Sequence, residues 1–388
     1  MIELQEYRST EVALNERDLA HLLEMVRGAG ESDEAKVIQT ITPTSTKDVY
    51  RISPGAFVGR IGLPSGETID IESRFDLHDV VDLIRFSGRL PIRLDRLAPA
   101  MDQEVFLLDV IASAFAREVD RLVSFGLAKG YRRYHFDRPL YPGRPDVTRH
   151  LSRYAARPDK LVTSARRITI DIELNRALAA ALDVLSRVPL TREPSRALSS
   201  LSSAFGRVKH SPTPADSLAR LDLDRLTVRY REALALAEII LRGQSLAPEG
   251  EIYGGASVLF NMPKVWEACV AKWVQQEWGP DYEVTEQYTF DVTLGGELRS
   301  EADVTVWRDG TLVGLYDAKY KWPGDKPKMG DVYQMVTYCT KLGIDTATLV
   351  YPVWAEQKTY RVGDVTVHTL GLDVGRLMED SSDLALAV

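Results

Sequence analysis

Two aspartates and a lysine near the C-terminal end have the types and spacing to do chemistry. Asp303, and Asp317 with Lys319 two positions later, lie in the stretch ELRSEADVTVWRDGTLVGLYDAKYK, residues 297–321. Two close carboxylates repel each other unless a cation joins them, and oxygen ligands suit Mg²⁺ or Mn²⁺. With a nearby ammonium group, such a cation is suited to hydrolysing a phosphodiester. The alternative is an exposed hairpin whose charges are merely solvated.

A β-hairpin is the element that would position these residues. Two apolar-rich runs, 302–307 and 311–316, flank the step Asp309-Gly310. An Asp-Gly step between alternating runs is among the stronger short-range hairpin signals. The sequence therefore predicts two antiparallel strands joined by a tight turn.

Strand alternation then predicts where the charged side chains lie. Residues two apart point to the same face of a strand, so Asp317 and Lys319 share a face. Asp303 is near the beginning of its strand and Asp317 at the end of the next. We expect the hairpin to bring both carboxylates and the ammonium group to one edge.

The residues Asp303-Val304-Thr305-Val306 and Asp317-Ala318-Lys319-Tyr320-Lys321 resemble the metal-binding core of the PD-(D/E)XK nuclease superfamily, and within it the McrC family. That family usually has Arg-Pro-Asp where this chain has Glu301-Ala302-Asp303. The proline shapes the backbone and carries no ligand. The resemblance implies that Asp303 and Asp317 hold Mg²⁺ or Mn²⁺, and that Lys319 positions or polarises the attacking water.

Two flanking segments extend this resemblance. The segment NMPKVWE, 261–267, opens a helical pattern and is similar to the family's first core helix, with its acidic residue at Glu267. The segment DVYQMVTY, 331–338, resembles the helix after the catalytic strand, with Gln334 facing the site. The resemblance thus implies that Glu267 and Gln334 complete the site. It also implies a core whose elements follow the order helix, three strands and helix.

Composition bounds the class of protein. The 388 residues are 45% hydrophobic and 27% charged, which is typical of a globular chain. No run approaches a membrane span and no secretory signal is evident, so we expect a cytoplasmic protein without membrane contact. Two cysteines and six histidines at scattered positions do not indicate zinc. A net charge of −8 means that any DNA affinity must come from a local patch or a partner.

We predict an α+β multidomain fold in three parts. Residues 1–95 form a β-rich domain with strands near 37–42, 49–52, 56–63 and 67–73, and residues 96–248 a mainly helical middle region. Residues 249–388 form an α/β PD-(D/E)XK nuclease domain, a mixed sheet flanked by helices. The Ser-rich stretch 195–213 is predicted to be a loop. By resemblance to McrC, residues 1–95 are the partner-docking domain.

The middle region contains a cluster of basic residues interleaved with tyrosines. Such a cluster either grips a phosphate backbone or forms an ion-paired, solvated surface. Its members are Arg132, Arg133, Arg144, Arg149, Arg153, Arg166 and Arg167, with Tyr131, Tyr134 and Tyr154.

The chain has no GxxxxGK[ST] motif, so any NTP-driven motor must be another polypeptide. The resemblance implies a Mg²⁺-dependent DNA endonuclease subunit of a McrBC-like type IV restriction complex. It would cut modified, methylated foreign double-stranded DNA when assembled with a McrB-like AAA+ GTPase hexamer, and would stimulate NTP hydrolysis by that hexamer. One alternative is a catalytically inactive adaptor that activates the ring. Another is a repair nuclease of the same superfamily that acts on DNA ends without a GTPase.

Overall fold

The chain folds into two compact units. One unit contains Met1–Val110 and Arg242–Val388, and the other contains Ile111–Leu241. Both predicted domain boundaries, after residues 95 and 248, lie outside the described residues, so the three-part division stays a prediction. The computed structural model describes residues 1–28, 36–87, 106–136, 143–154, 157, 160–209, 214–218, 221–245, 257–293, 297–321, 326–353, 357–373 and 377.

The N-terminal part of the first unit is built on two small sheets. The four-stranded sheet has the order β1 (Ile2–Gln5), β6 (Thr68–Glu72), β5 (Phe57–Gly62), β10 (Val258–Asn261). The three-stranded sheet has the order β2 (Thr10–Ala13), β4 (Val49–Pro54), β3 (Ile38–Pro43). Helices α1 (Glu16–Gly28) and α2 (Leu77–Ser87) accompany them. The four predicted strands are confirmed, whereas β1, β2 and α1 were not predicted.

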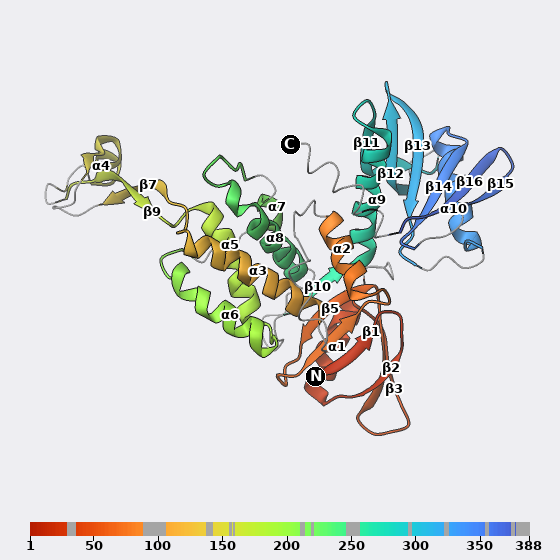
Figure 1. The fold of residues 1–388 in the computed structure, drawn as a ribbon, viewed down its shortest axis with the longest axis horizontal. Helices are drawn as coiled ribbons and strands as arrows, with labels where there is room; N and C mark the ends of the chain where they lie inside the picture. The colour runs from red at the N-terminus through yellow and green to blue at the C-terminus, as the bar shows by residue number, and fades with distance from the viewer. Residues whose placement is uncertain are drawn as a thin grey trace. The chain divides into compact units, whose positions relative to one another are not determined.

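The second part of the same unit is a six-stranded mixed sheet, drawn in light to dark blue in Figure 1. Its order is β11 (Glu283–Asp291), β12 (Arg299–Arg308), β13 (Thr311–Ala318), β14 (Thr346–Tyr351), β16 (Val365–Gly371), β15 (Lys358–Val362). Strands β13, β14 and β16 are parallel and the other pairs are antiparallel. Helix α9 (Met262–Trp278) precedes β11, and α10 (Met329–Leu342) lies between β13 and β14 in the chain. The elements therefore follow the predicted order of helix, three strands and helix.

The hairpin β12–β13 shows why this sheet is covered on both faces. Asp309 and Gly310 both have positive φ angles, 51° and 76°, as a tight two-residue hairpin turn requires. Along β13, Leu315 packs into the cluster around Met335 of α10, whereas Tyr316 accepts a hydrogen bond from Trp278 of α9 at 2.8 Å. Successive side chains point to opposite faces, so the sheet lies between α9 and α10.

Local signals set the ends of both helices. The Asn261 side chain accepts a hydrogen bond from the Lys264 backbone N–H at 3.1 Å, which caps the first turn of α9. At the end of α10, Gly343 has a φ of 74° and donates its N–H to the carbonyl of Cys339 at 2.9 Å. Trp266 of α9 is fully buried and donates to the Val350 carbonyl at 3.1 Å. These contacts set the helix register against the sheet.

The second unit is mainly helical, as predicted, with one small sheet that was not predicted. The sheet has the order β7 (Gly130–Phe136), β9 (Thr163–Thr169), β8 (Arg144–Pro145). The α-helices are α3 (Leu107–Ser124), which begins in the first unit, α4 (Val147–Tyr154), α5 (Glu173–Arg187), α6 (Arg192–Ser202), α7 (Ala215–Leu218) and α8 (Arg231–Ser245), with 3₁₀ turns η4 (Ser203–Phe205) and η5 (Val228–Tyr230).

Helix α6 contradicts the loop predicted for 195–213. Pro194, Leu198 and Leu201 recur at helical spacing and are buried, so packing outweighs the low helix propensity of serine. The serine hydroxyls bond to carbonyls of the preceding turn, as Ser199 does to Ser195 at 2.8 Å. Residues 210–213 of the predicted loop lie outside the described residues.

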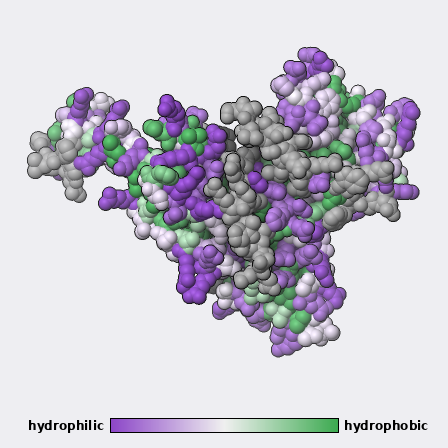
Figure 2. All heavy atoms as spheres, in the orientation of Figure 1, coloured by the Kyte–Doolittle hydropathy of each residue, from purple (hydrophilic) through white to green (hydrophobic). Residues whose placement is uncertain are grey.

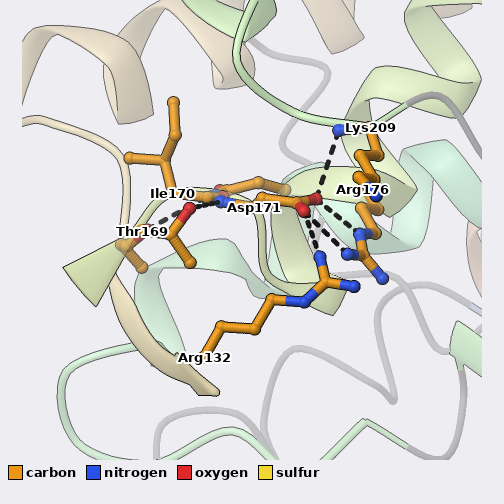
Figure 3. A network of polar contacts seen from close by, with 8 residues as sticks. Arg132, Thr169, Ile170, Asp171, Arg176 and Lys209 are labelled. Carbon is orange, nitrogen blue, oxygen red and sulfur yellow. Dashed lines mark hydrogen bonds and ion pairs between the residues drawn. The ribbon is translucent and has the colours of Figure 1, made fainter. Parts of the chain in front are cut away.

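A buried aspartate organises the junction of β9 and α5 (Figure 3). Asp171 receives a two-pronged contact from Arg176, at 2.6 and 2.9 Å, together with contacts from Arg132 and from the backbone N–H of Lys209 at 3.1 Å. The pKa of Asp171 is lowered to about 2, mainly by the hydrogen bonds that Arg176 donates. This carboxylate is fully satisfied as an anion.

The face drawn in Figure 2 is mostly hydrophilic with apolar patches between. Several large apolar side chains of the second unit are exposed, including the cross-strand neighbours Tyr131 and Ile168. None of the helices in the described parts of the chain is both long and apolar enough to cross a membrane.

Candidate active site

The hairpin brings the two predicted carboxylates together. Val304 pairs with Tyr316, so the next positions along the two strands are Asp303 and Asp317. Asp303 accepts a hydrogen bond from the Ala318 backbone N–H at 2.8 Å, which fastens it across the strand pair. Asp317 is 2% exposed. Asp303 lies in the middle of β12 and not near its beginning as predicted, but the pairing places it beside the end of β13, where Asp317 lies.

Lys319 and Gln334 join them from the strand end and from α10. The Lys319 ammonium lies 2.7 Å from Asp317 Oδ2 and donates to Gln334 Oε1 at 3.0 Å. The backbone N–H of Lys319 donates to the Val350 carbonyl at 2.8 Å, so the backbone still follows β14 at this point. The predicted pairing of Asp317 with Lys319 on one face is present.

Glu267 approaches the same place from α9. It pairs with Lys264 at 2.7 Å and receives a contact from Gln287 of β11 at 3.5 Å. Its negative charge is among the causes that raise the pKa of Asp303. All five predicted site residues therefore come from four elements to one region of the sheet.

The charged form of the carboxylate pair is unfavourable in the absence of a bound cation. Burial and the adjacent Asp317 raise the pKa of Asp303, and burial likewise raises the pKa of Asp317 despite the opposing effect of Lys319. Burial disfavours the charged form of Lys319, but the Asp317 and Asp303 carboxylates outweigh it and raise the pKa of Lys319. Lys264 is paired with Glu267, so Lys319 is the ammonium group left beside the two buried carboxylates. Two carboxylates beside one ammonium leave a net negative charge, which favours binding of a cation.

The donor set fits a hard divalent cation. Asp317 Oδ2 is buried, and its ion-pair partner is the Lys319 ammonium at 2.7 Å. Among the described residues no group of three His, Cys, Asp or Glu side chains is close enough to hold a metal alone. Mg²⁺ commonly takes one or two carboxylates and keeps several waters, which suits Asp303 and Asp317.

Three neighbours of the site were not predicted. Gln287 occupies the β11 position opposite Asp303 with a φ of 54°, an uncommon backbone conformation for a residue with a side chain. Asp331, one turn before Gln334 on α10, pairs with Lys321. Tyr338 lies one turn after Gln334, and its hydroxyl accepts a hydrogen bond from the Gln334 side-chain amide at 2.9 Å. The spacing 331, 334, 338 is a helical face and was readable from the sequence, but the positive φ at Gln287 was not.

The basic cluster of the second unit divides into paired and exposed members. Arg132 is engaged by Asp171, which fits the ion-paired interpretation for this residue. Arg133 and Arg166 are exposed and stand directly opposite each other on β7 and β9. Like charges placed opposite one another are unfavourable. A role in gripping phosphate stays a prediction for this exposed pair.

The fold and site together define a mixed α+β protein with a carboxylate pair and a lysine at one end of a central hairpin. A family model described as "McrBC 5-methylcytosine restriction system component" matches residues 52–352, and the chain belongs to this family. No curated protein matches the chain in sequence.

Two solved structures are similar to this chain. The first is a refined half-complex from a tetradecameric assembly of Thermococcus gammatolerans McrB AAA+ hexamers with bound McrC. The matched chain is 13% identical, with a TM-score of 0.64 and 99% of each chain covered. The second is the T. gammatolerans McrBC complex, at 15% identity and a TM-score of 0.48, covering 72% of this chain and 88% of that one. The first likeness shows that the fold extends over the whole chain.

Proposed function

We propose that this chain is the DNA-cleaving subunit of a modification-dependent restriction complex that acts in the cytoplasm. The observation that carries the proposal is the convergence of Asp303, Asp317 and Lys319 at the end of one hairpin, with Gln334 and Glu267 beside them. The order of α9, β11, β12, β13 and α10 supports a PD-(D/E)XK core. Membership in the McrBC component family supports the same reaction class.

The residues have distinct tasks in this proposal. Asp303 and Asp317 would hold Mg²⁺ or Mn²⁺, which when bound supplies charge neutralisation at the phosphate and activation of the attacking water. Lys319 stays protonated because the carboxylates raise its pKa, so it orients the water and stabilises charge that develops on the phosphate. Gln334 helps to hold the Lys319 ammonium by accepting a hydrogen bond from it at 3.0 Å. Each chain would cut one strand, so a double-strand break requires two chains.

The partner proposed for this chain is a McrB-like AAA+ GTPase hexamer. The similar structure contains McrB hexamers with bound McrC, and this chain has no GxxxxGK[ST] motif of its own. The ring would supply recognition of modified DNA, and this chain would cut the DNA and stimulate NTP hydrolysis. Residues 1–95 remain the proposed docking region.

Plasmid cleavage tests the proposal. The chain is combined with its AAA+ partner, Mg²⁺ and GTP, on methylated and unmethylated plasmid, and wild type is compared with Lys319→Ala. We expect double-strand breaks on methylated plasmid that need partner, nucleotide and Lys319. Lys341→Ala is the matched control, because this lysine lies in the last turn of α10 on an exposed position.

An inactive adaptor that activates the AAA+ ring is the second candidate function. Two observations favour it. Position 302 is alanine, and the described residues contain no group of three His, Cys, Asp or Glu side chains that could hold a metal ion. Stimulated GTP hydrolysis with no cut on any plasmid, in the presence of either Mg²⁺ or Mn²⁺, would establish the adaptor and overturn the nuclease.

A further inference from the structure

The residue after Lys319, Tyr320, packs its side chain against residues at the ends of two strands of the N-terminal sheet. Tyr320 is 6% exposed, and its hydroxyl donates to Glu6 Oε1 at 3.1 Å and lies 3.1 Å from Ser73 Oγ. The ring of Phe75 packs against it with a centroid distance of 5.1 Å. Glu6 directly follows β1 and Ser73 directly follows β6, so Tyr320 is held where two parallel strands end.

Arg74 holds the backbone of the same residue. Its guanidinium donates to the Tyr320 carbonyl at 2.5 Å and lies 5.0 Å from the centre of the Tyr320 ring. Glu6 Oε1 in turn accepts from the Arg74 backbone N–H at 2.9 Å and from Ser73 Oγ at 2.9 Å. One buried carboxylate therefore orders the set of groups that grips both ends of Tyr320.

This grip acts one residue from the ammonium that the proposed reaction needs. Strand β13 ends at Ala318, and Lys319 has a single ladder bond, to Val350 at 2.8 Å. Beyond it the path of the chain is set by Tyr320 on the N-terminal side and by the contact of Lys321 with Asp331. A rotation of the backbone at Tyr320 would carry the Lys319 side chain away from Asp317 and Gln334.

We propose that Tyr320 is a positioning residue that holds the Lys319 ammonium in the cleavage site, with Glu6, Ser73 and Arg74 of the N-terminal sheet as its anchor. The inference rests on the proposed function for its effect on cleavage. The claim that Tyr320 fixes the position of Lys319 does not depend on the proposed function. The N-terminal sheet is thereby part of the machinery that organises the nuclease site.

Two measurements on the full chain test this. Tyr320→Phe keeps the ring and removes only the hydroxyl, and Ser73→Ala is a second, smaller change at the anchor. Tyr230→Phe is the matched control, because Tyr230 is also a buried tyrosine, whose hydroxyl donates to Asn175 at 2.8 Å in the second unit. The first measurement is the rate at which an amine-specific reagent labels Lys319, read by mass spectrometry. The second is the single-turnover rate of cleavage with partner, Mg²⁺ and GTP.

We expect Lys319 to be labelled severalfold faster in Tyr320→Phe than in wild type, and at the wild-type rate in Tyr230→Phe. Cleavage by Tyr320→Phe should fall roughly tenfold with the KM for DNA unchanged, since a small displacement of a reacting group costs rate rather than binding. In a Lys319→Gln background, Tyr320→Phe should have no further effect on whatever cleavage remains. Labelling of Lys319 at the wild-type rate in both Tyr320→Phe and Ser73→Ala would overturn the proposal. If Lys319 is labelled faster in Tyr320→Phe than in wild type, but wild type cuts no plasmid, the positioning role stands and the proposed nuclease function is refuted.

Discussion

Two buried aspartate clusters of this chain differ in how they treat negative charge. Asp171 in the second unit receives two arginines and a backbone N–H, and its pKa is lowered. Asp303 and Asp317 share one adjacent lysine, Lys319, and the pKa of both carboxyl groups is raised. The first cluster is complete without a ligand and serves the fold. The second is unfavourable as it stands, and such an arrangement is typical of a site that binds a cation.

The largest expected effect separates function from stability at the second cluster. Asp303→Asn keeps the shape of the side chain and its acceptor for Ala318 but removes the disfavoured charge. We expect cleavage to fall at least about a hundredfold. Without divalent cation, the free energy of unfolding of the variant should be about 1 kcal/mol higher than that of wild type. Cleavage assays and urea denaturation without divalent cation measure the two quantities. If Asp303→Asn is less stable than wild type, the charge of Asp303 is not unfavourable in the folded protein.

Asp171→Asn should show the opposite behaviour. The substitution leaves Arg132 and Arg176 without their anion, and we expect a loss of about 2 to 3 kcal/mol in the free energy of unfolding at pH 7. Cleavage per folded molecule should be unchanged, because Arg132, Arg176 and Lys209, which hold Asp171, all belong to the second unit. Urea denaturation gives the stability, and activity normalised to folded fraction gives the control. A specific loss of cleavage at full folding would show that the second unit carries a catalytic role.

The pH dependence of stability distinguishes the clusters again. The Asp171 pKa in the folded chain is about 2, below its ordinary value of 3.8, so its contribution is complete above pH 4 and disappears as the pH falls towards 2. It amounts to about 2 kcal/mol. The difference in unfolding free energy between wild type and Asp171→Asn should therefore shrink from pH 4 down to pH 2. The Asp303 pKa lies above its ordinary value, so the gain from Asp303→Asn should instead grow as the pH rises from 4 towards 8.

The smallest effect is the response to metal. Mg²⁺ binds the folded chain through Asp303 and Asp317 in our proposal, so a concentration ten times the Kd should stabilise wild type by about 1.4 kcal/mol. Asp303→Asn should lose most of this gain, and Asp171→Asn should retain it. Thermal unfolding with Mg²⁺ and after EDTA measures the shifts in Tm. Equal shifts in all three proteins would place the cation elsewhere.

Local patterns in the sequence predicted the hairpin and its charged edge. The Asp309-Gly310 turn requires positive φ angles that few residues tolerate, and alternation along β13 then places Asp317 and Lys319 together. The helices carrying Glu267 and Gln334 were also predictable, because capping and apolar spacing are local signals.

Contacts between distant parts of the chain were not predictable in this way. The grip of Glu6 and Arg74 on Tyr320 joins segments more than two hundred residues apart, and nothing in either segment names the other. The helix α6 was missed because its serines favour loops in isolation, and only the burial of Leu198 and Leu201 makes it helical. The positive φ at Gln287 likewise depends on neighbours that a single strand does not reveal.

Strand β10 limits how this chain can be divided or exchanged. It pairs with β5, so residues from the C-terminal part of the chain complete the N-terminal sheet. A fragment that stops before residue 257 would expose the backbone groups of β5 along an open edge, and such edges promote aggregation. Recombination that exchanged C-terminal parts between relatives would have to match β10 to a foreign β5. Natural or engineered chimaeras of this family should therefore tolerate crossover points after Asn261 better than points before Val258.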